Sequence, residues 1–585
     1  MTKGIRIANL QELENVRKQY NEKQKKYQYR VAVCSGTGCI SSKCEDVRDA
    51  LIEAINKNGL AEKVFVSCTG CIGLCSLGPL MAVYPEGVLY TKLTPELIPE
   101  IVKSHLAYGE IKTENTYYDV RKEVHIPHIK DIDFFHDQVR ISLRNCGYID
   151  CTSLEEYIAQ DGYLGFARAL LEMKPAQVVR EVKASGLRGR GGAGFPTGVK
   201  WETTLNTAGK EKYIICNADE GIPGSYMDKA LLEGDPHTII EGMLIGAYAV
   251  GATKGYVYIR AEYPLAVDRL DIAINQARKA GLLGVNILGS RFDFDIEIRT
   301  GAGAFICGEE TAMLQSIEGL RGEPRQKPPL PTESGLFGKP TVINNVETLA
   351  SIPPILLNGS AWYSAFGTQD SKGTKIFSLS GSLVNNGLIE VPMGFTLRKI
   401  LEEISGGIKN NKAFKAAQTG GPSGGCITSE FLDTPLDFSS MQKIGTIMGS
   451  GDFVVMDEDA CMIDMVKYFM EFVQEESCGR CTSCRIGTKR MLEIIERITQ
   501  GEGREGDIEL LEELGNTIIE TSACGLGQTA PNSVLSTIRY FRDEYNEHIR
   551  NKQCRTGVCT ELIQLNRAGK TEGQTCKVLL LTTKK

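Results

Sequence analysis

Residues 185–201 read SGLRGRGGAGFPTGVKW, a stretch with six glycines, two arginines and one lysine in seventeen residues. Glycines let the backbone approach a phosphate and present N–H groups to it, and Arg190 and Lys200 can neutralise its charge. An ordinary glycine-rich loop can have the same composition, so the surrounding sequence must decide between the two. The stretch favours a domain that binds a phosphate-bearing cofactor.

The sequence around this loop alternates short β-rich runs, such as KYIICN, GYVYIRAE and DFDIEIRT, with helical runs. This order is typical of an α/β layer fold. Asn217, Asp219 and Glu220 follow the first of these runs and offer hydrogen-bonding groups for a polar ring or for ribitol hydroxyls. The sequence therefore predicts a nucleotide site at this position.

A second polar run, TGAGAFICGEETAML, places Gly308, Glu309 and Glu310 directly before a predicted helix. Carboxylates beside a dinucleotide site commonly accept hydrogen bonds from ribose hydroxyls and repel a 2′-phosphate. The run therefore favours NAD(H) over NADP(H).

Composition indicates a modular globular protein. The chain has 585 residues, 42% hydrophobic and 24% charged, with a formal net charge of −7. That balance excludes collagen-like, coiled-coil and largely disordered proteins, and it gives no reason to expect nucleic-acid binding. No run of about 18 apolar residues predicts a membrane span, and no apolar core of a signal peptide begins the chain, so we expect a cytoplasmic protein.

Periodicity and composition divide the chain into segments. We expect a polar extension with two or three helical turns at most, and a helix-like stretch DFFHDQVRISLRNCG in the connector. The expected fold class is multidomain α/β plus α. The predicted segments are the extension (1–28), a small α/β module (29–110), the connector and helices (111–180), a Rossmann-like cofactor domain (181–360), a β-grasp-like domain (375–456), a helical domain (457–550) and a tail (551–585).

Four cysteines in the small α/β module suit a metal cluster. Cys34 and Cys39 follow its first strand in a C-x4-C spacing, and Cys71 and Cys75 follow its second in a C-x3-C spacing. Thiolates on two glycine-containing loops match a [2Fe–2S] site. A structural zinc site or two reducible disulfides are the alternatives. Residues 31–90 resemble the thioredoxin-like [2Fe–2S] ferredoxin domain.

The helical domain carries a second set. Cys478, Cys481 and Cys484 have C-x2-C-x2-C spacing, and Cys524 returns forty residues later. Three thiolates on one turn and a fourth from a distant helix end fit a [4Fe–4S] cluster, whose negative charge Arg480 and Arg485 would offset. Zinc is the alternative, although its motifs more often pair two C-x2-C units.

Several motifs together show a wider resemblance. SGLRGRGGAGFPTGVKW, CNADE, GAGAFICGEETAML, RQKPPLP and INNVETLA resemble the flavin subunit of the NADH dehydrogenase module of respiratory complex I. The fused ferredoxin domain makes the chain more similar to HydB-type subunits of NADH-linked, often electron-bifurcating, hydrogenases and formate dehydrogenases. The resemblance covers nearly all of residues 31–560.

The resemblance implies a diaphorase-type subunit that passes electrons between NAD(H), FMN and iron–sulfur clusters. Its partners would be a small [2Fe–2S] subunit and a catalytic hydrogenase, formate dehydrogenase or second nicotinamide subunit. A flavin-free iron–sulfur scaffold is one alternative. A complex I flavin subunit proper is another, disfavoured by the fused ferredoxin domain.

Cofactor contacts follow from the resemblance residue by residue. NADH contacts would be Phe195, Glu310 and Lys327. The chain departs from the family at Ile222, where an acidic residue is common, and at Leu330, where an aromatic one is common. The implied FMN contacts are Gly189, Arg190, Gly191, Gly192, Gly194, Lys200, Asn217, Asp219, Glu220, Gly308, Glu309, Asn344 and Asn345.

The tail offers a set of ligands for zinc. His548, Cys554 and Cys559 would supply an imidazole and two thiolates, which suits a tetrahedral site with one further thiolate. Cys461 and Cys576 are both candidates for the fourth position, and we favour Cys461 because it matches a cysteine found before the triplet in the family. Free buried thiols are the alternative.

Overall fold

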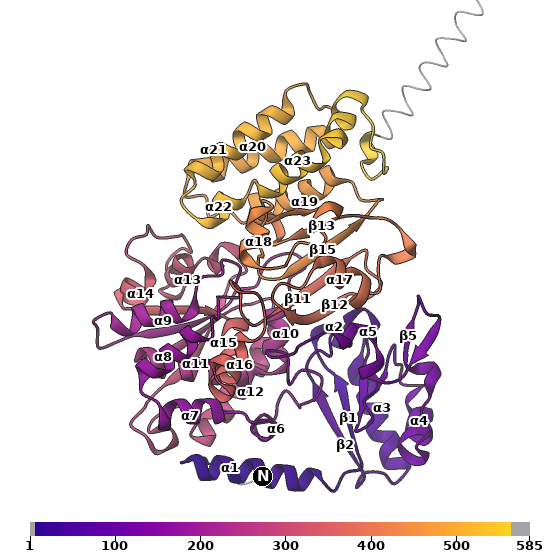
Figure 1. Ribbon diagram of the computed structural model, residues 1–585, viewed down its shortest axis with the longest axis vertical. Coiled ribbons are helices and arrows are strands. Elements are labelled where there is room, and N and C mark those ends of the chain that lie inside the picture. The colour runs from indigo at the N-terminus through magenta and orange to yellow at the C-terminus, as the bar shows by residue number, and fades with distance from the viewer. Residues whose placement is uncertain (1–5, 563–585) are drawn as a thin grey trace, which may run out of the picture.

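The computed structural model describes residues 6–562. Figure 1 shows the ferredoxin-like domain beside the α/β cofactor domain, the β-rich domain above both, and the helical domain at the far end. The first described helix is α1 (Leu10–Gln24), which is longer than the two or three turns expected. Asn9 caps this helix by accepting a hydrogen bond from the Glu12 N–H, and the Tyr20 hydroxyl bonds Glu156, 2.7 Å away, so the helix is docked on the connector.

The ferredoxin-like domain has a four-stranded sheet in the order β2-β1-β3-β4. The parallel pairing of its first two strands brings their carboxyl ends, and the cysteine loops that follow, to one edge. Val47, Leu51 and Ile98 from its helices lie in the same buried core as Val31 and Val83 from its strands. The bounds are β1 (Tyr29–Cys34), α2 (Thr37–Ser41), α3 (Cys44–Lys57), β2 (Val64–Thr69), β3 (Met81–Tyr84), β4 (Val88–Tyr90) and α4 (Ile98–Ile101).

The connector corrects one expectation. The helix predicted across DFFHDQVRISLRNCG is a single turn, α5 (Asp133–His136). Beyond it the backbone bonds to a neighbouring strand: the Glu390 carboxylate accepts from the Ser142 and Leu143 N–H groups, and the Val139 N–H donates to the Glu390 carbonyl. Tertiary partners have replaced helical hydrogen bonds there. The other connector elements are β5 (Tyr117–Asp119), β6 (Val124–Ile126), α6 (Leu154–Ala159), α7 (Leu164–Glu172) and α8 (Pro175–Ala184).

The cofactor domain is the α/β layer structure that the alternating runs predict. Its sheet is fully parallel in the order β10-β7-β8-β9, so the carboxyl ends of all its strands meet at one edge, where ligands of such sheets bind. Its strands are β7 (Tyr213–Ala218), β8 (Lys254–Arg260), β9 (Asp295–Gly301) and β10 (Thr341–Asn345). Its helices are α9 (Thr197–Asn206), α10 (Met227–Gly234), α11 (Pro236–Val250), α12 (Pro264–Ala280), α13 (Glu310–Ile317), α14 (Pro331–Ser334), α15 (Val346–Asn358) and α16 (Ser360–Ser364).

The expected β-rich domain contains a mixed five-stranded sheet in the order β12-β11-β15-β13-β14. The β11–β15 pair is parallel, and the other three pairs are antiparallel. Its elements are β11 (Thr374–Gly381), β12 (Gly387–Pro392), α17 (Leu397–Lys399), β13 (Phe414–Thr419), β14 (Gly425–Ile427), α18 (Phe438–Lys443) and β15 (Asp452–Asp457).

The last described domain is helical, as its 3.6-residue periodicity predicts. Its core contains Ile463, Met470, Ile495 and Ile538, contributed by long helices that meet there. Within residues 6–562, no helix has the length and apolar character needed to cross a membrane. The helices are α19 (Met462–Glu475), α20 (Thr482–Thr499), α21 (Asp507–Thr521), α22 (Gly525–Thr529) and α23 (Asn532–Asn546).

Candidate functional site

The glycine-rich loop lies at the carboxyl edge of the parallel sheet. The Gly189 N–H donates to the Phe195 carbonyl, 2.8 Å away, which closes the loop into a tight turn. Gly194 has a positive φ of 65°, and a Cβ there would lie 2.5 Å from the Phe438 ring. A Cβ on Gly191 would meet the Asn345 side chain at 3.1 Å. The loop therefore holds its backbone close to the end of β10, where a phosphate-bearing ligand can approach it.

Arg190 does not have the role that we expected from its position. Its side chain is 1% exposed, and its guanidinium donates four hydrogen bonds: to the carbonyls of Arg188, Lys372 and Thr374 and to the Tyr363 hydroxyl. These donors are therefore engaged within the protein. The side chain ties the glycine-rich loop to the start of β11, and the structure gives no support to its use as a phosphate ligand.

Two asparagines at the end of β10 are held in fixed orientations. The Trp201 indole N–H donates to Asn344 Oδ1, 2.9 Å away. Asn345 Oδ1 accepts from the Glu347 N–H at the start of α15, and Asn345 Nδ2 donates to Asp228 Oδ2 at 2.5 Å. Both residues lie where the family resemblance places flavin contacts.

Asn217 and Asp219, at the end of β7, face the Gly308 loop. Asn217 Nδ2 donates to the Gly308 carbonyl at 2.9 Å, and the Asp219 N–H donates to Asn217 Oδ1 at 3.1 Å. Asp219 Oδ2 is buried and has no hydrogen-bond partner among residues 6–562. Burial raises the pKa of Asp219 to about 7. An unsatisfied buried carboxyl oxygen beside a glycine-lined edge fits a bound polar cofactor.

Glu220 braces the loop that follows β7. Its carboxylate accepts hydrogen bonds from the Asp228 and Lys229 N–H groups at 3.1 and 3.0 Å and from the Ser225 hydroxyl at 3.0 Å. The loop after Glu220 and the first turn of α10 are therefore both held by this carboxylate.

Two ion pairs surround the start of α13. Glu309 caps the helix by accepting from the Thr311 and Ala312 N–H groups, and Lys327 Nζ lies 2.8 Å from its carboxylate. Although burial opposes it, the Lys327 ammonium lowers the pKa of Glu309. Glu310 forms an ion pair with Lys200, which also donates to the Ile343 carbonyl at 3.0 Å. Lys200 is therefore bound to a carboxylate and is not aimed at a free phosphate position.

The side chain of Phe195 is 53% exposed, as a surface that stacks on a nicotinamide or adenine ring requires.

Ile222, at the position where the family commonly has an acid, lies against the β-rich domain: a Cβ on Gly421 would meet its methyl group at 2.3 Å. The departure at this position is therefore explained by packing between domains. Leu330 is 48% exposed.

The four candidate cluster ligands of the ferredoxin-like domain come together at the ends of β1 and β2. Cys71 and Cys75 have their Sγ atoms 3.3 Å apart, and Cys34 contacts both Cys39 and Cys71. A Cβ on Gly78 would lie 2.9 Å from Cys39 Sγ, so only glycine fits beside this thiol. The structure therefore assembles the set that the spacing predicts.

The second set also comes together, between α19, α20 and α22. Cys484 lies near three other thiols, those of Cys478, Cys481 and Cys524. Its burial, with a smaller contribution from these thiols, raises the pKa of Cys484 to about 11. The N–H groups of Leu526 and Gly527 point at Cys524.

The loop that carries this triplet contacts the cofactor domain. Arg321 donates to the Cys478 carbonyl at 2.8 Å, and Arg480 bonds the Pro324 carbonyl. Arg485 bonds the Gly479 carbonyl. The two arginines expected to offset cluster charge therefore also fix this loop.

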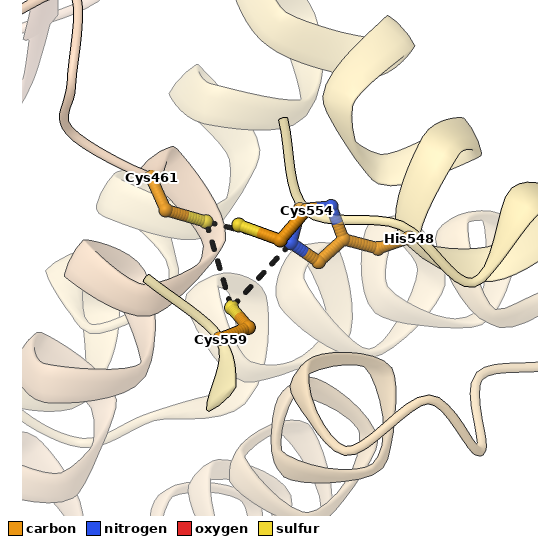
Figure 2. Close-up of side chains that lie close together, drawn as sticks. All are labelled: Cys461, His548, Cys554 and Cys559. Carbon is orange, nitrogen blue, oxygen red and sulfur yellow. Dashed lines mark hydrogen bonds between the residues drawn. The ribbon is translucent and has the colours of Figure 1, made fainter. Parts of the chain in front are cut away.

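The third set is the most compact. Figure 2 shows Cys461, His548, Cys554 and Cys559 pointing toward one another; their ligand atoms all lie within 4.8 Å of one another and all four residues are buried. His548 Nε2 is 3.5 Å from the Sγ of both Cys461 and Cys559. Cys461 thus occupies the fourth position, and Cys576 lies outside the described residues.

Sequence reasoning missed Lys375 and Glu347, a fully buried ion pair between β11 and α15. Glu347 also accepts from the Ile376 N–H at 2.8 Å, so the pair joins the β-rich domain to the helix that follows Asn345. A signal was present: INNVETLA and TKIFSLS each place one charge in an otherwise buried run.

Three family descriptions match separate parts of the chain. Residues 182–354 match the Nuo51 FMN-binding domain, residues 464–548 match the iron–sulfur binding region of NADH-ubiquinone oxidoreductase-F, and residues 3–105 match the thioredoxin-like [2Fe–2S] ferredoxin. Each falls on one of the sites described above.

Similar proteins extend over most of the chain. The NADP-reducing hydrogenase subunit HndC of Solidesulfovibrio fructosivorans is 57% identical over 426 residues, 73% of this chain and 86% of that protein. An NADH-quinone oxidoreductase subunit of Escherichia coli K12 is 44% identical over 404 residues, 68% of this chain and 90% of that protein. A solved structure of an NAD⁺-reducing [NiFe]-hydrogenase in the air-oxidised state is 28% identical, with a TM-score of 0.62, and the match covers 93% of this chain and 91% of that one.

Proposed function

This chain belongs to the family of NADH-binding FMN and iron–sulfur subunits of complex I and of related hydrogenases, with a thioredoxin-like [2Fe–2S] domain at its N-terminus, and from this premise we propose how its residues serve that activity. It is an oxidoreductase subunit of the NADH dehydrogenase type. We assign it to a hydrogenase-type or formate-dehydrogenase-type complex, because its ferredoxin domain is fused to the flavin domain.

One contact most directly supports electron transfer between the nucleotide site and a cluster. The loop of Cys478 bonds Arg321 and Pro324, which follow the helix that begins at Glu309 and Glu310. A cluster on that loop would therefore lie beside the nucleotide site. Electron transfer from the cofactor site into a cluster requires such proximity.

FMN, when bound, supplies a group that exchanges hydride with a nicotinamide and exchanges electrons singly with clusters. The chain's own part is to bind and orient. Gly189, Gly191, Gly192 and Gly194 would let the loop backbone approach the phosphate, and Phe195 would stack on a nucleotide ring. We assign the polar contacts to Asn217, Asp219, Gly308, Asn344 and Asn345. Glu220 and Arg190 instead support these contacts by holding their loops.

The unpartnered Asp219 Oδ2 argues against a flavin-free scaffold, because a buried carboxyl oxygen without a partner is costly unless a ligand satisfies it. Ile222 gives that alternative no support, since it packs on Gly421.

Anaerobic titration with NADH tests the proposal. Purified protein should show flavin and iron–sulfur absorbance that NADH bleaches. Cluster absorbance without flavin would favour the scaffold, and flavin that NADH does not reduce would exclude diaphorase activity.

We further propose that Cys461, His548, Cys554 and Cys559 bind zinc. Three thiolates and one imidazole within 4.8 Å of one another fit a closed tetrahedral site, and all four residues are buried. The site joins the start of α19 to the segment after α23, so the metal would fix the end of the helical domain.

The partners are other subunits of such a complex. We propose a small [2Fe–2S] subunit, with a hydrogenase, a formate dehydrogenase or a second nicotinamide subunit as the terminal component. So many thiol ligands fit a reducing compartment, and we propose that the complex is cytoplasmic. Mass spectrometry of co-purifying chains identifies the terminal component, and electron bifurcation is tested by whether NADH drives two acceptors of different potential together.

A further inference from the structure

The loop from Cys34 to Cys39 is hydrogen-bonded to the cofactor domain. The Glu233 carboxylate, at the end of α10, accepts from the N–H of Thr37 at 2.9 Å and also from its hydroxyl. The Arg269 guanidinium, on α12, donates to the carbonyl and the hydroxyl oxygen of Ser35 at 2.7 and 2.9 Å. Both bonded residues of the loop lie between its two cysteines, so the cofactor domain holds the segment that joins two candidate cluster ligands.

The two side chains bring opposite charges to this loop. Glu233 is 2% exposed and Arg269 is 6% exposed. Arg269 bonds Glu233 through the backbone carbonyl, at 2.6 Å, while the Glu233 carboxylate bonds Thr37. Each charge is therefore directed at the cysteine loop, and because both are buried, water and salt screen them weakly.

Helix α10 connects this loop to the cofactor site. At its start, Asp228 Oδ2 accepts from Asn345 Nδ2, 2.5 Å away, and Asn345 lies where the family resemblance places a flavin contact. Asp228 and Glu233 belong to the same helix, and their separation in sequence corresponds to about 7.5 Å along a helix axis. One short helix thus carries a carboxylate for each of the two sites.

We propose that Glu233 and Arg269 are positioning residues that hold the first cysteine loop for electron exchange with the cofactor domain, and that they tune the [2Fe–2S] site in opposite directions. Arg269 raises its reduction potential and Glu233 lowers it. The inference rests on the proposed function, which places a cluster on the four candidate ligands of the ferredoxin-like domain. Neither side chain gains or loses an electron or a proton in the exchange.

The physical reason is electrostatic. Reduction adds one negative charge to the site, so a nearby cation stabilises the reduced state and a nearby anion destabilises it. The Arg269 guanidinium is a permanent cation beside Ser35, the residue that follows Cys34. Loss of packing would act differently, because removing either side chain's bonds would loosen the same loop and admit water in the same way. The sign of each shift therefore separates a charge effect from a packing effect.

An EPR-monitored redox titration of the purified holoprotein tests the inference. We expect Arg269→Gln to move the midpoint of the [2Fe–2S] signal to a more negative potential and Glu233→Gln to move it to a more positive one. The [4Fe–4S] midpoint should stay unchanged in both. Arg269→Lys keeps the charge and should lie nearer to the wild type than Arg269→Gln.

Arg278→Gln is the matched control. Arg278 lies on the same helix as Arg269, and its guanidinium bonds Asp295 and the Ile296 carbonyl within the cofactor domain. This variant should leave both midpoints where they are in the wild type.

Unchanged [2Fe–2S] midpoints, or shifts with any other pair of signs, overturn the inference while leaving the proposed function intact. Glu233→Gln is nearly isosteric, so its positive shift is required even if Arg269→Gln does not fold. A wild-type protein without a [2Fe–2S] signal overturns both the inference and the proposed cluster.

Hydrogen–deuterium exchange of the whole chain tests the positioning without reference to a potential. Glu233→Ala removes the acceptor of the Thr37 N–H, so exchange in the peptide that contains Thr37 should become faster. Glu297→Ala, which removes a partly exposed carboxylate on β9, should leave that exchange unchanged. Equal exchange of this peptide in wild type and Glu233→Ala would show that the carboxylate does not hold the loop.

Discussion

His548 Nδ1 lies 2.8 Å from the Glu544 carbonyl oxygen, to which its N–H donates, and this bond turns Nε2 toward the sulfurs of Cys461 and Cys559. The ring is therefore held in the tautomer that ligates metal through Nε2. Glu544 lies one helical turn before His548, so the group that orients this imidazole belongs to the same chain segment.

The zinc proposal predicts that His548→Ala loses the metal. Elemental analysis of wild type should find one zinc per chain, and the variant should have little or none. Because the site fixes residues 554–559 to α19, limited proteolysis should cut the variant there first. His136→Ala, an exposed histidine, serves as the control and should keep its zinc. Wild type without zinc in a metal-analysed sample would contradict the assignment.

The cysteine triplet predicts a specific iron count. One [2Fe–2S] and one [4Fe–4S] cluster give about six irons per chain, and Cys478→Ala should leave about two. The EPR signal of the [4Fe–4S] cluster should vanish while flavin stays bound, because Cys478 lies on the loop that contacts Arg321 and is not in the glycine-rich loop.

Cys426→Ala is the matched control for that variant, since Cys426 is a buried cysteine whose thiol donates to Gln418 Oε1 and whose backbone N–H donates to the Ser536 hydroxyl oxygen. It should keep all the irons. An iron content near ten in wild type would indicate clusters beyond these two sets and would refute the count.

Arg190 illustrates what sequence could not provide. Its neighbours in sequence indicated a phosphate loop, and that loop does lie at the sheet edge. The bond from its guanidinium to Thr374 joins residues 184 positions apart, and no local pattern reports such a pairing. The cysteine sets were predictable because ligand spacing within a turn is local, and their spacing already defines a geometry. The connector at 137–147 was mispredicted for the same reason as Arg190: its backbone partners lie on a distant strand.

The revised role of Arg190 predicts a stability effect. Arg190→Lys keeps the charge but loses the planar set of donors, leaving buried carbonyls of Lys372 and Thr374 unpaired. We expect a loss of about 2–4 kcal/mol in stability, seen as a lower urea midpoint. Arg299→Lys, on an exposed part of β9, should change the midpoint little. A direct phosphate ligand would instead show a large loss of FMN affinity with an unchanged midpoint.

Asp219 predicts a pH dependence of the flavin-free protein. Burial raises its pKa from an ordinary 3.8 to about 7, so the folded chain holds an extra proton between these values. Stability therefore falls as pH rises from about 4 to about 7, by about 4 kcal/mol at most, and changes no further above that. Asp219→Asn cannot ionise and should lose less stability over that range. Unfolding temperatures at about pH 5 and about pH 7.5 measure this, and identical pH dependence in both proteins would exclude Asp219 as its source.

Glu310 predicts the coenzyme preference. Its carboxylate can accept ribose hydroxyl bonds and would face the 2′-phosphate of NADPH, although the ion pair with Lys200 offsets part of its charge. We therefore expect kcat/KM with an artificial acceptor to favour NADH over NADPH by about tenfold, or ~1.4 kcal/mol.

Glu310→Gln should bring that ratio toward one for two reasons that act in the same direction. The carboxylate charge is removed, and Lys200 loses its ionic partner and becomes available to a 2′-phosphate. Glu297→Gln, a partly exposed carboxylate on β9, is the control and should leave the ratio unchanged. Equal rates with NADH and NADPH in wild type, or the same ratio in wild type and Glu310→Gln, would show that another residue sets the preference. The 57% identical relative named as NADP-reducing makes the wild-type ratio the first measurement to take.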